Sequence, residues 1–296
     1  MGIRVGTFTL ALVVLCGSLA AAARGPLRVL VTNDDGVKAP GIDALVRELA
    51  ANPNLTVTVV APATNQSLTA DRFTSTAITV TPSSTAGAFP ATAIGGYPAD
   101  TVLFAVLHMP QRPDLVVSGI NFGQNIGELV TLSGTVGAGL TAARLGIPAI
   151  AVSQGVGASI TYADAAAYVG RLVERFRLSR GFRAKLTTRS GLRHALVVNV
   201  NFPTCTAGGT RGIRVVPLGR SSQVTGYTLT GTTGATQTFA PTIPPVNALG
   251  SDCQSTLASP TTDVEAMVNG FASVTPLNAD LTTSGNLGKF RFLLRR

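Results

Sequence analysis

Short runs of Val, Ile and Leu alternate along this chain with stretches whose apolar residues recur at helical spacing. Near-continuous apolar runs between helices are typical of parallel strands that are buried on both faces. The pattern therefore predicts an α/β protein with a doubly wound, mostly parallel sheet. The expected strands are 27–32, 56–61, 115–118, 149–153, 195–201 and 271–275, and the expected helices are 40–51, 99–107, 135–145, 162–176 and 263–270.

The residue composition changes beyond Pro203. Residues 220–262 are rich in Ser, Thr, Gly and Pro and have few large apolar side chains. This composition is typical of turns and exposed strands rather than of a second core. We expect extended hairpins here, forming an arm of a single domain that covers residues 24–296.

Residues 1–23 have the pattern of a secretory signal peptide. Arg4 precedes an uncharged stretch with its apolar centre at 10–16, and small residues follow at 17–23. A cation, a short apolar run and small residues before the cleavage site define such leaders. The alternative is an uncleaved membrane anchor, although 10–16 is shorter than the ~20 residues that span a bilayer. We expect a secreted or periplasmic protein that keeps no stable membrane span after leader removal.

Two cysteines remain behind the leader, Cys205 and Cys253. In an oxidising compartment they form either one disulfide or two separate buried thiols, and the sequence leaves both readings open. Two cysteines are too few for a disulfide scaffold, and their spacing is not that of a zinc site.

Composition and charge narrow the function classes. The chain has 296 residues, of which 45% are hydrophobic, which excludes intrinsic disorder, and a 12% charged content argues against a coiled coil. Its net charge of +9 indicates an anionic partner class. Much of the positive charge lies in residues 171–193, away from the strand ends, either as a solvated face or as a contact for an anionic surface. We expect no specific nucleic-acid partner.

Short oxygen-bearing side chains follow the predicted strands, where open parallel sheets bind their ligands. Asp34 and Asp35 are suited to a hard divalent cation, or else one caps the next helix and the other is solvated. The segment 133–135 opens a predicted helix and either binds phosphate or is an ordinary N-cap. The strand-end residues are Asn33, Asp34, Asp35, Gly36, Asn65, Gln66, Ser67, Gly119, Asn121, Asn125, Gly127, Ser133, Gly134 and Thr135.

Other catalytic classes lack their signatures. The histidines, His108 and His194, adjoin no strand-end motif, and the chain has no G-x-S-x-G elbow, so a Ser-His-Asp hydrolase is disfavoured. The first predicted strand is not followed by G-x-G-x-x-G, which argues against a dinucleotide enzyme. Metal-assisted chemistry on a phosphate remains.

Several blocks, in this order, resemble the SurE (survival protein E) family of metal-dependent 5′/3′-nucleotidases and acid phosphatases. The NDDG and SGIN…SGTVGA blocks at this spacing carry the resemblance. The matching blocks are VLVTNDDGVKAPGI (29–42), VVAPATNQS (59–67), GYPADTV (96–102), PDLVVSGINFGQNIG (113–127), SGTVGAG (133–139), LGIPAIAVS (145–153), VVNVNFP (197–203), GIRV (212–215) and TDVEAMVNGFASVTPLNADLT (262–282).

The resemblance implies a three-layer αβα, Rossmann-like fold and a phosphomonoesterase that uses one divalent cation, Mg²⁺ or Mn²⁺. It implies a small phosphate ester, a nucleotide, as substrate, and a homodimer or homotetramer built through an exchanged C-terminal arm. The implied metal ligands are Asp34, Asp35, Ser67 and Asn121.

We expect Asp34 or Asp35 to act as the general base for the attacking water. The expected substrate-binding residues are Asn121, Asn125, Ser133, Gly134 and Thr135. The chain departs from the family pattern at Ala63-Thr64, where Asp-Arg is usual, and at Glu128-Leu129, where Asp-Asp is usual. The alternative function is a secreted polyanion-binding protein with the same fold and little catalysis.

Overall fold

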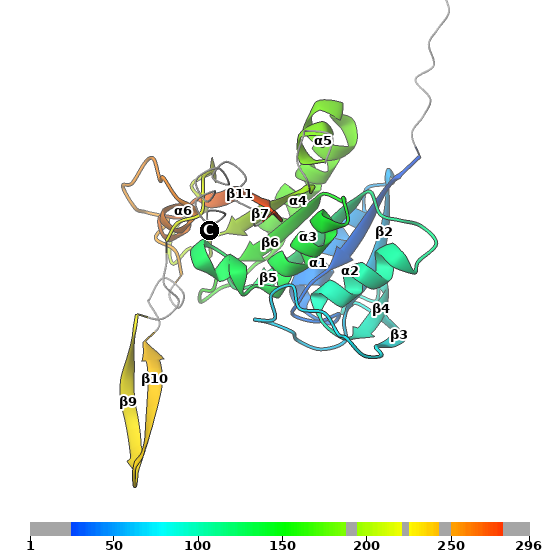
Figure 1. The fold of residues 1–296 in the computed structure, drawn as a ribbon. Coiled ribbons are helices and arrows are strands. Elements are labelled where there is room, and N and C mark those ends of the chain that lie inside the picture. The colour runs from blue at the N-terminus through cyan, green and yellow to red at the C-terminus, as the bar shows by residue number, and fades with distance from the viewer. Residues whose placement is uncertain (1–24, 188–193, 221–224, 243–249, 281–296) are drawn as a thin grey trace, which may run out of the picture.

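The structure, a computed structural model of the chain, describes residues 25–187, 194–220, 225–242 and 250–280 (Figure 1). The expected leader at 1–23 lies outside these residues. The strands are β1 Leu27–Thr32, β2 Leu55–Pro62, β3 Thr79–Ser84, β4 Pro90–Gly95, β5 Leu115–Phe122, β6 Ala149–Gln154, β7 Leu196–Phe202, β8 Ile213–Val215, β9 Gly226–Thr233, β10 Thr236–Thr242 and β11 Ala272–Asn278. The helices are α1 Pro40–Ala50, α2 Pro98–Leu107, the 3₁₀ helix η1 Gly127–Thr131, α3 Gly134–Arg144, α4 Ala163–Leu178, α5 Arg180–Leu186 and α6 Asp263–Val268.

One nine-stranded sheet has the order β3-β4-β2-β1-β5-β6-β7-β11-β8. Along this order, every adjacent pair of strands from β4 to β7 is parallel. Antiparallel pairing occurs where β3 meets β4 and where β11 meets β7. The predicted α/β fold with a mostly parallel sheet is therefore confirmed. Because β1 lies between β2 and β5, the loops that follow these three strands emerge side by side at one edge of the sheet.

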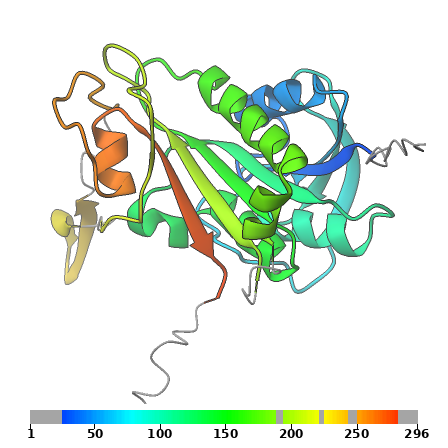
Figure 2. The ribbon, with the colours of Figure 1, turned by 90° about the horizontal axis from the view of Figure 1, so that it is seen from above.

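The period of two along the strands divides the core into two layers. In β1, Val29 and Val31 face the layer that contains α1 and α4, whereas Leu30 faces the layer that contains α2 and α3. Figure 2 shows α1 in blue and α4 in green together on one side of the sheet. The apolar strands predicted from the sequence therefore lie between two layers of helices. This packing fixes the direction of each strand and so the edge of the sheet at which it ends.

The apolar pattern of the sequence does not predict β3, β4 or α5. The strand β3 is mostly exposed at the sheet edge, and Thr79–Ser84 (TVTPSS) has a single Val among Thr, Pro and Ser residues. A strand at the edge of a sheet is largely exposed to solvent, so the apolar pattern in its sequence is weak. The short helix α5 is rich in basic residues. Its sequence therefore resembles a continuation of the charged face of the preceding helix, α4.

The segment expected to form an arm contains a hairpin of its own. Strands β9 and β10 pair antiparallel in a separate two-stranded sheet, and Figure 1 shows this hairpin extending away from the main sheet. Both strands are mostly exposed along their length. A lone hairpin is at best marginally stable in water, so this one is a surface that another chain or segment can cover.

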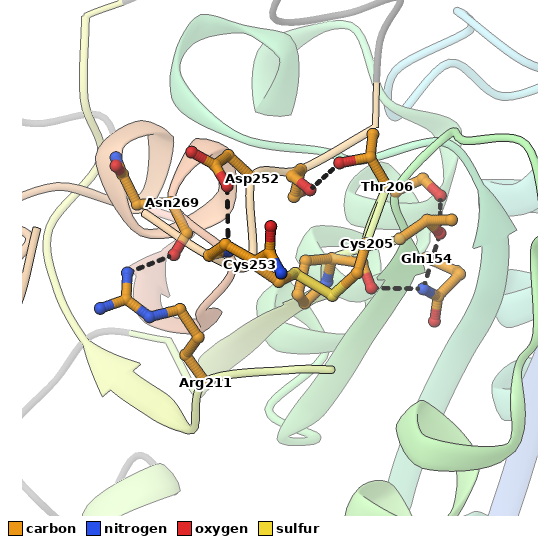
Figure 3. Close-up of a disulfide and its surroundings, with 12 residues drawn as sticks. Gln154, Cys205, Thr206, Arg211, Asp252, Cys253 and Asn269 are labelled. Carbon is orange, nitrogen blue, oxygen red and sulfur yellow. Dashed lines mark hydrogen bonds between the residues drawn. A yellow bond between two sulfur atoms is a disulfide. The ribbon is translucent and has the colours of Figure 1, made fainter. Parts of the chain in front are cut away.

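Cys205 and Cys253 form a disulfide, which resolves the two readings left open by the sequence (Figure 3). It joins the loop after β7 to the segment before α6, and the backbone of Ser251 also exchanges hydrogen bonds with Thr204 and Thr206. Arg211 donates to the carbonyl oxygen of Asn269 at 2.9 Å beside it. The C-terminal segment is therefore tied to the main sheet both covalently and by hydrogen bonds.

Candidate functional site

Asp34 and Asp35 lie in a turn that leaves β1 after Thr32. The side-chain Nδ2 of Asn33 donates to the carbonyl oxygen of Gly36 at 2.9 Å and closes this turn. Gly36 has φ +103°, and a Cβ there would lie 3.1 Å from the backbone carbon of Thr64. Because the chain leaves the strand before the two aspartates, their carboxylates are freed from the alternation that would place them on opposite faces.

Asp34 packs against the N-terminus of α3. Its side chain is almost fully buried, at 2% exposure, and its Oδ1 accepts a hydrogen bond of 2.6 Å from the hydroxyl of Thr135. Gly134 provides the space, because a Cβ there would lie 2.8 Å from the Cβ of Asp34. Burial raises the pKa of Asp34 to about 6; the charge of Asp35 adds to the rise, and the hydrogen bonds from Thr135 oppose it.

Asp35 is held from the neighbouring loops. Its Oδ2 accepts the backbone N–H of Phe122 at 2.9 Å, and its Oδ1 accepts a long hydrogen bond of 3.5 Å from Nδ2 of Asn65. Burial raises the pKa of Asp35, and the bond from Phe122 opposes that rise. Burial raises the pKa of the Tyr162 phenol, and the charge of Asp35 adds to that rise. Tyr162 was not predicted from the sequence, where it only marks the start of a helix.

The loop after β2 crosses the same edge of the sheet. The backbone N–H of Gln66 donates to the carbonyl oxygen of Asp34 at 2.6 Å, and the backbone N–H of Ser67 donates to Oδ1 of Asn65 at 2.9 Å. The N–H of Ala70 donates to the carbonyl oxygen of Leu132 at 3.0 Å and holds the loop over the start of α3. The side chain of Ser67 is exposed beside this edge, without a hydrogen bond from the described residues.

Asn121 is the penultimate residue of β5, next to Phe122, whose N–H binds Asp35. Its Nδ2 donates to the carbonyl oxygen of Gly123 at 2.7 Å, which turns its Oδ1 away from that carbonyl. Within the described part of the chain Oδ1 accepts no hydrogen bond, so this oxygen is available to a ligand. The register of β5 against β6 shifts between Ser118 and Asn121, and this irregularity re-aims the end of the strand.

Asn125 and Ser133 are engaged inside the protein. Nδ2 of Asn125 donates to the hydroxyl of Ser153 at 2.9 Å, and its backbone N–H donates to Oδ1 of Asn201 at 2.7 Å. The hydroxyl of Ser133 accepts the N–H of Val136 at 3.1 Å and caps α3. The expected substrate contacts at these two positions therefore involve side chains that already support the loop and the helix.

Asp263 is a site-supporting residue that the sequence reasoning missed. Its carboxylate is fully buried at the start of α6, where Oδ2 accepts the N–H of Gly127 at 2.9 Å and Oδ1 accepts the N–H of Gly219 at 2.6 Å. Burial raises the pKa of Asp263, opposed by these backbone hydrogen bonds. The available sequence signal was an aspartate in the first turn of a predicted helix, which usually indicates an N-terminal charge only.

The donor set fits a hard divalent cation. The described residues hold no group of three or more His, Cys, Asp or Glu arranged for a metal, so a soft or nitrogen-rich site is not present among them. What this edge offers is two carboxylates, the unbonded amide oxygen of Asn121 and the hydroxyl of Ser67. Mg²⁺ and Mn²⁺ take oxygen ligands and are commonly held by one or two carboxylates, with water and substrate phosphate completing the shell.

A doubly wound α/β sheet with paired aspartates at the end of β1 and a helix N-terminus beside them defines a class of phosphate-handling hydrolytic sites. The family model described as survival protein SurE matches residues 29–225. This chain belongs to the SurE family, as the motif resemblance predicts.

Named relatives and a solved structure extend over most of the chain. The 5′-nucleotidase SurE of Cereibacter sphaeroides (strain ATCC 17029 / ATH 2.4.9) is 37% identical over 278 residues, covering 90% of this chain and all of that protein. The 5′-nucleotidase SurE of Symbiobacterium thermophilum is 32% identical over 266 residues, covering 89% and 96%. The crystal structure of SurE from Aquifex aeolicus aligns with a TM-score of 0.69 and 29% identity, covering 90% of this chain and 100% of that one.

Proposed function

We propose that this protein is a divalent-cation-dependent phosphomonoesterase that hydrolyses nucleoside monophosphates or related small phosphate esters. Its similarity to proteins named 5′-nucleotidase makes it a hydrolase of phosphoric monoesters. The observation that carries the proposal is the convergence of Asp34 and Asp35 at the end of β1, with the start of α3 hydrogen-bonded to Asp34.

Asp34, Asp35, Ser67 and Asn121 would hold one Mg²⁺ or Mn²⁺. When bound, such a cation supplies Lewis-acid polarisation of a phosphoryl oxygen and neutralises charge that develops in the reaction. Asp34 or Asp35 takes the proton of the attacking water. Since α3 begins with Gly134 beside Asp34, its first backbone N–H groups and helix dipole attract the phosphate oxygens. Thr135 orients the Asp34 carboxylate through its hydroxyl.

We also propose a compartment and an assembly. A disulfide persists in secreted and periplasmic proteins and is rare in the cytosol, so the Cys205–Cys253 bridge supports removal of 1–23 as a signal peptide. No helix among the described ranges is long and apolar enough to cross a membrane. The exposed β9–β10 hairpin supports a homodimer or homotetramer joined through the arm.

The competing polyanion-binding function is less well supported. In the basic helices α4 and α5, Arg177 forms an ion pair of 2.7 Å with Glu174. The guanidinium of Arg183 donates to the carbonyl oxygen of Arg177 at 2.7 Å and thereby stabilises the end of α4. Arg175 stacks on Phe182 with its Cζ 5.4 Å from the ring centroid. Several of these cations therefore serve the fold itself.

Hydrolysis of p-nitrophenyl phosphate tests the proposal directly. We expect activity that is abolished by EDTA and restored by Mg²⁺ or Mn²⁺, and that falls by at least about 100-fold in Asp34→Asn and in Asp35→Asn. Asp114→Asn is the matched control, because Asp114 pairs with Arg28 on the surface at 2.8 Å. Metal-stimulated activity that survives in both site variants would contradict the assignment.

A further inference from the structure

Some cations of α4 and α5 do not serve the fold. The two helices contain six basic side chains and two acidic ones, Asp164 and Glu174. Glu174 is paired with Arg177 at 2.7 Å, and Asp164 lies in the first turn of α4, away from the basic residues of its last turns. Four of the basic side chains are exposed and pair with no carboxylate within the described part of the chain: Arg171, Arg175, Arg180 and Lys185.

An exposed leucine lies among these cations. Arg171, Arg175 and Leu178 follow one another at spacings of four and three residues, which places them on one face of α4. Leu178 is the last residue of α4 and is 64% exposed. The nearby rings are half-buried, because the guanidinium of Arg171 lies over Tyr168 and that of Arg175 over Phe182. The surface is therefore cationic and apolar, without an exposed aromatic ring.

The end of α4 and the whole of α5 lie at the edge of the sheet opposite the candidate site. Since β6 and β7 are parallel neighbours, the chain between them returns from the edge where β6 ends to the edge where β7 begins. Asn52, which lies just before the start of β2, donates to Glu174 at 3.1 Å and so marks the same edge. In Figure 1 α5 projects from the body of the molecule. A flat partner can reach this surface without covering Asp34 and Asp35.

We propose that the α4–α5 surface, made of Arg171, Arg175, Leu178, Arg180 and Lys185, docks the protein on a bilayer that carries anionic phospholipids. Charge complementarity carries the proposal, because basic residues on a surface helix are attracted to the phosphates of such a bilayer. Leu178 can enter the boundary between headgroups and acyl chains while the longer basic side chains reach the phosphates. A single-stranded nucleic acid fits less well, since it stacks its bases on exposed rings.

Cosedimentation with lipid vesicles tests the docking. Wild type should bind vesicles of equal parts phosphatidylglycerol and phosphatidylcholine, and it should not bind vesicles of phosphatidylcholine alone. We expect the binding to weaken at least about 10-fold between about 0.05 M and about 0.5 M NaCl, because salt screens exposed charges. The variant Arg171→Gln/Arg180→Gln/Lys185→Gln should bind at least about 10-fold more weakly than wild type. Leu178→Gln should weaken binding without any change of charge.

A matched control separates this surface from the net charge of the protein, which is +9. Lys38→Gln/Arg72→Gln/Arg220→Gln removes three exposed cations that lie outside α4 and α5, so its net charge equals that of the other triple variant. We expect this control to bind anionic vesicles within about twofold of wild type, because attraction to a membrane surface falls off within a Debye length.

A fluorescent reporter shows which face meets the membrane. The chain contains no tryptophan, so a single introduced tryptophan reports only its own surroundings. The emission of Leu178→Trp should shift to shorter wavelength when anionic vesicles are added, because the indole leaves water. Phe73→Trp replaces a ring that is 60% exposed between β2 and β3, and its emission should stay unchanged.

The outcomes separate docking from its alternatives and from catalysis. Failure of wild type to bind anionic vesicles, equal losses in the two triple variants, or equal shifts of the two tryptophans overturns the proposal. Binding of single-stranded DNA that the α4–α5 triple variant loses and Leu178→Gln keeps assigns the surface to nucleic acid and also overturns it. Hydrolysis of p-nitrophenyl phosphate should be unchanged in the α4–α5 triple variant, so the docking and the proposed function fail independently.

Discussion

The hydroxyl of Thr135 donates a 2.6 Å hydrogen bond to Oδ1 of Asp34 and so joins the first turn of α3 to the end of β1, across 101 positions of sequence. Both residues are buried, so the bond forms in a medium where a charge-assisted hydrogen bond is strong. It orients the carboxylate, and it opposes the effect of burial on the pKa of Asp34.

Replacing Thr135 by Val removes this hydroxyl with little change of shape. We expect kcat/KM for a phosphate ester to fall about 10-fold, since a hydrogen bond to a charged group contributes ~1.5–3 kcal/mol. The pKa of Asp34 rises when the bond is lost, so the acidic limb of the pH–rate profile moves to higher pH. Thr141→Val is the control, because the hydroxyl of Thr141 is buried in α3 without a hydrogen-bond partner among the described residues. If both substitutions lower kcat/KM equally, the loss of activity comes from altered packing and not from the lost hydrogen bond to Asp34.

Asp34→Asn should stabilise the metal-free protein while it abolishes activity. The folded pKa of Asp34 is about 6, above its ordinary value of 3.8, so ionisation costs folding free energy as pH rises through this range. The cost is absent well below pH 3.8, grows between the two pKa values and is complete above pH 7, where it is about 3 kcal/mol. Thermal unfolding in EDTA at pH 4.5 and pH 7.5 measures it, and we expect the Tm advantage of the variant to grow with pH.

The opposite sign is expected at Asp114, whose pKa is lowered chiefly by its hydrogen bonds and charge interaction with Arg28, against the effect of burial. A lowered pKa stabilises the fold above the ordinary pKa and loses that contribution as pH falls through the folded value. Asp114→Asn therefore lowers Tm at pH 7.5 by more than at low pH. If Asp34→Asn lowers Tm at pH 7.5 in the same way, burial is not the main influence on the pKa of Asp34.

Loss of the Cys205–Cys253 disulfide should destabilise the C-terminal part of the chain. The bridge closes a loop with a sequence separation of 48, for which the chain-entropy model gives about 4 kcal/mol. We expect Cys205→Ala/Cys253→Ala to lower the free energy of unfolding by about 2–4 kcal/mol in urea. Dithiothreitol should lower the stability of wild type and leave the double variant unchanged. If dithiothreitol also destabilises the double variant, the reductant acts on stability through something other than this disulfide.

Asp263→Asn should weaken both stability and catalysis. An amide has a single acceptor oxygen, so it cannot accept from Gly127 and Gly219 at once as the carboxylate does. A buried N–H left without a partner costs ~1–3 kcal/mol, which we expect as a lower urea midpoint. Activity falls too, because Gly127 lies in the loop that carries Asn125. Asp252→Asn is the control, since Asp252 is exposed and its carboxylate accepts only from the N–H of Gln254 within the described chain.

The apolar pattern of the sequence predicts the alternation of strands and helices, because runs such as LRVLVT at β1 are buried on both faces and carry an apolar signal that exposed segments lack. It also placed Asp34, Asp35, Asn121 and Thr135 at strand ends or a helix start, since parallel strands bring those ends to one edge. The strands β3 and β4 escaped prediction because β3 is a mostly exposed edge strand and β4 buries only Ala93 and Ile94, so neither carries a strong apolar pattern.

Which of these residues touch depends on how the segments pack in three dimensions. Hydrogen bonds join Thr135 to Asp34, Asp263 to Gly127 and Asp100 to Thr74 over 101, 136 and 26 positions, and no local pattern encodes such partners. The same holds for Arg72, which lies over Tyr97, and for Tyr162, whose pKa the charge of Asp35 helps to raise. Apolar periodicity is a property of each segment alone. The pairing of polar groups depends instead on how the segments pack against one another, because a polar group that becomes buried needs a hydrogen-bond partner.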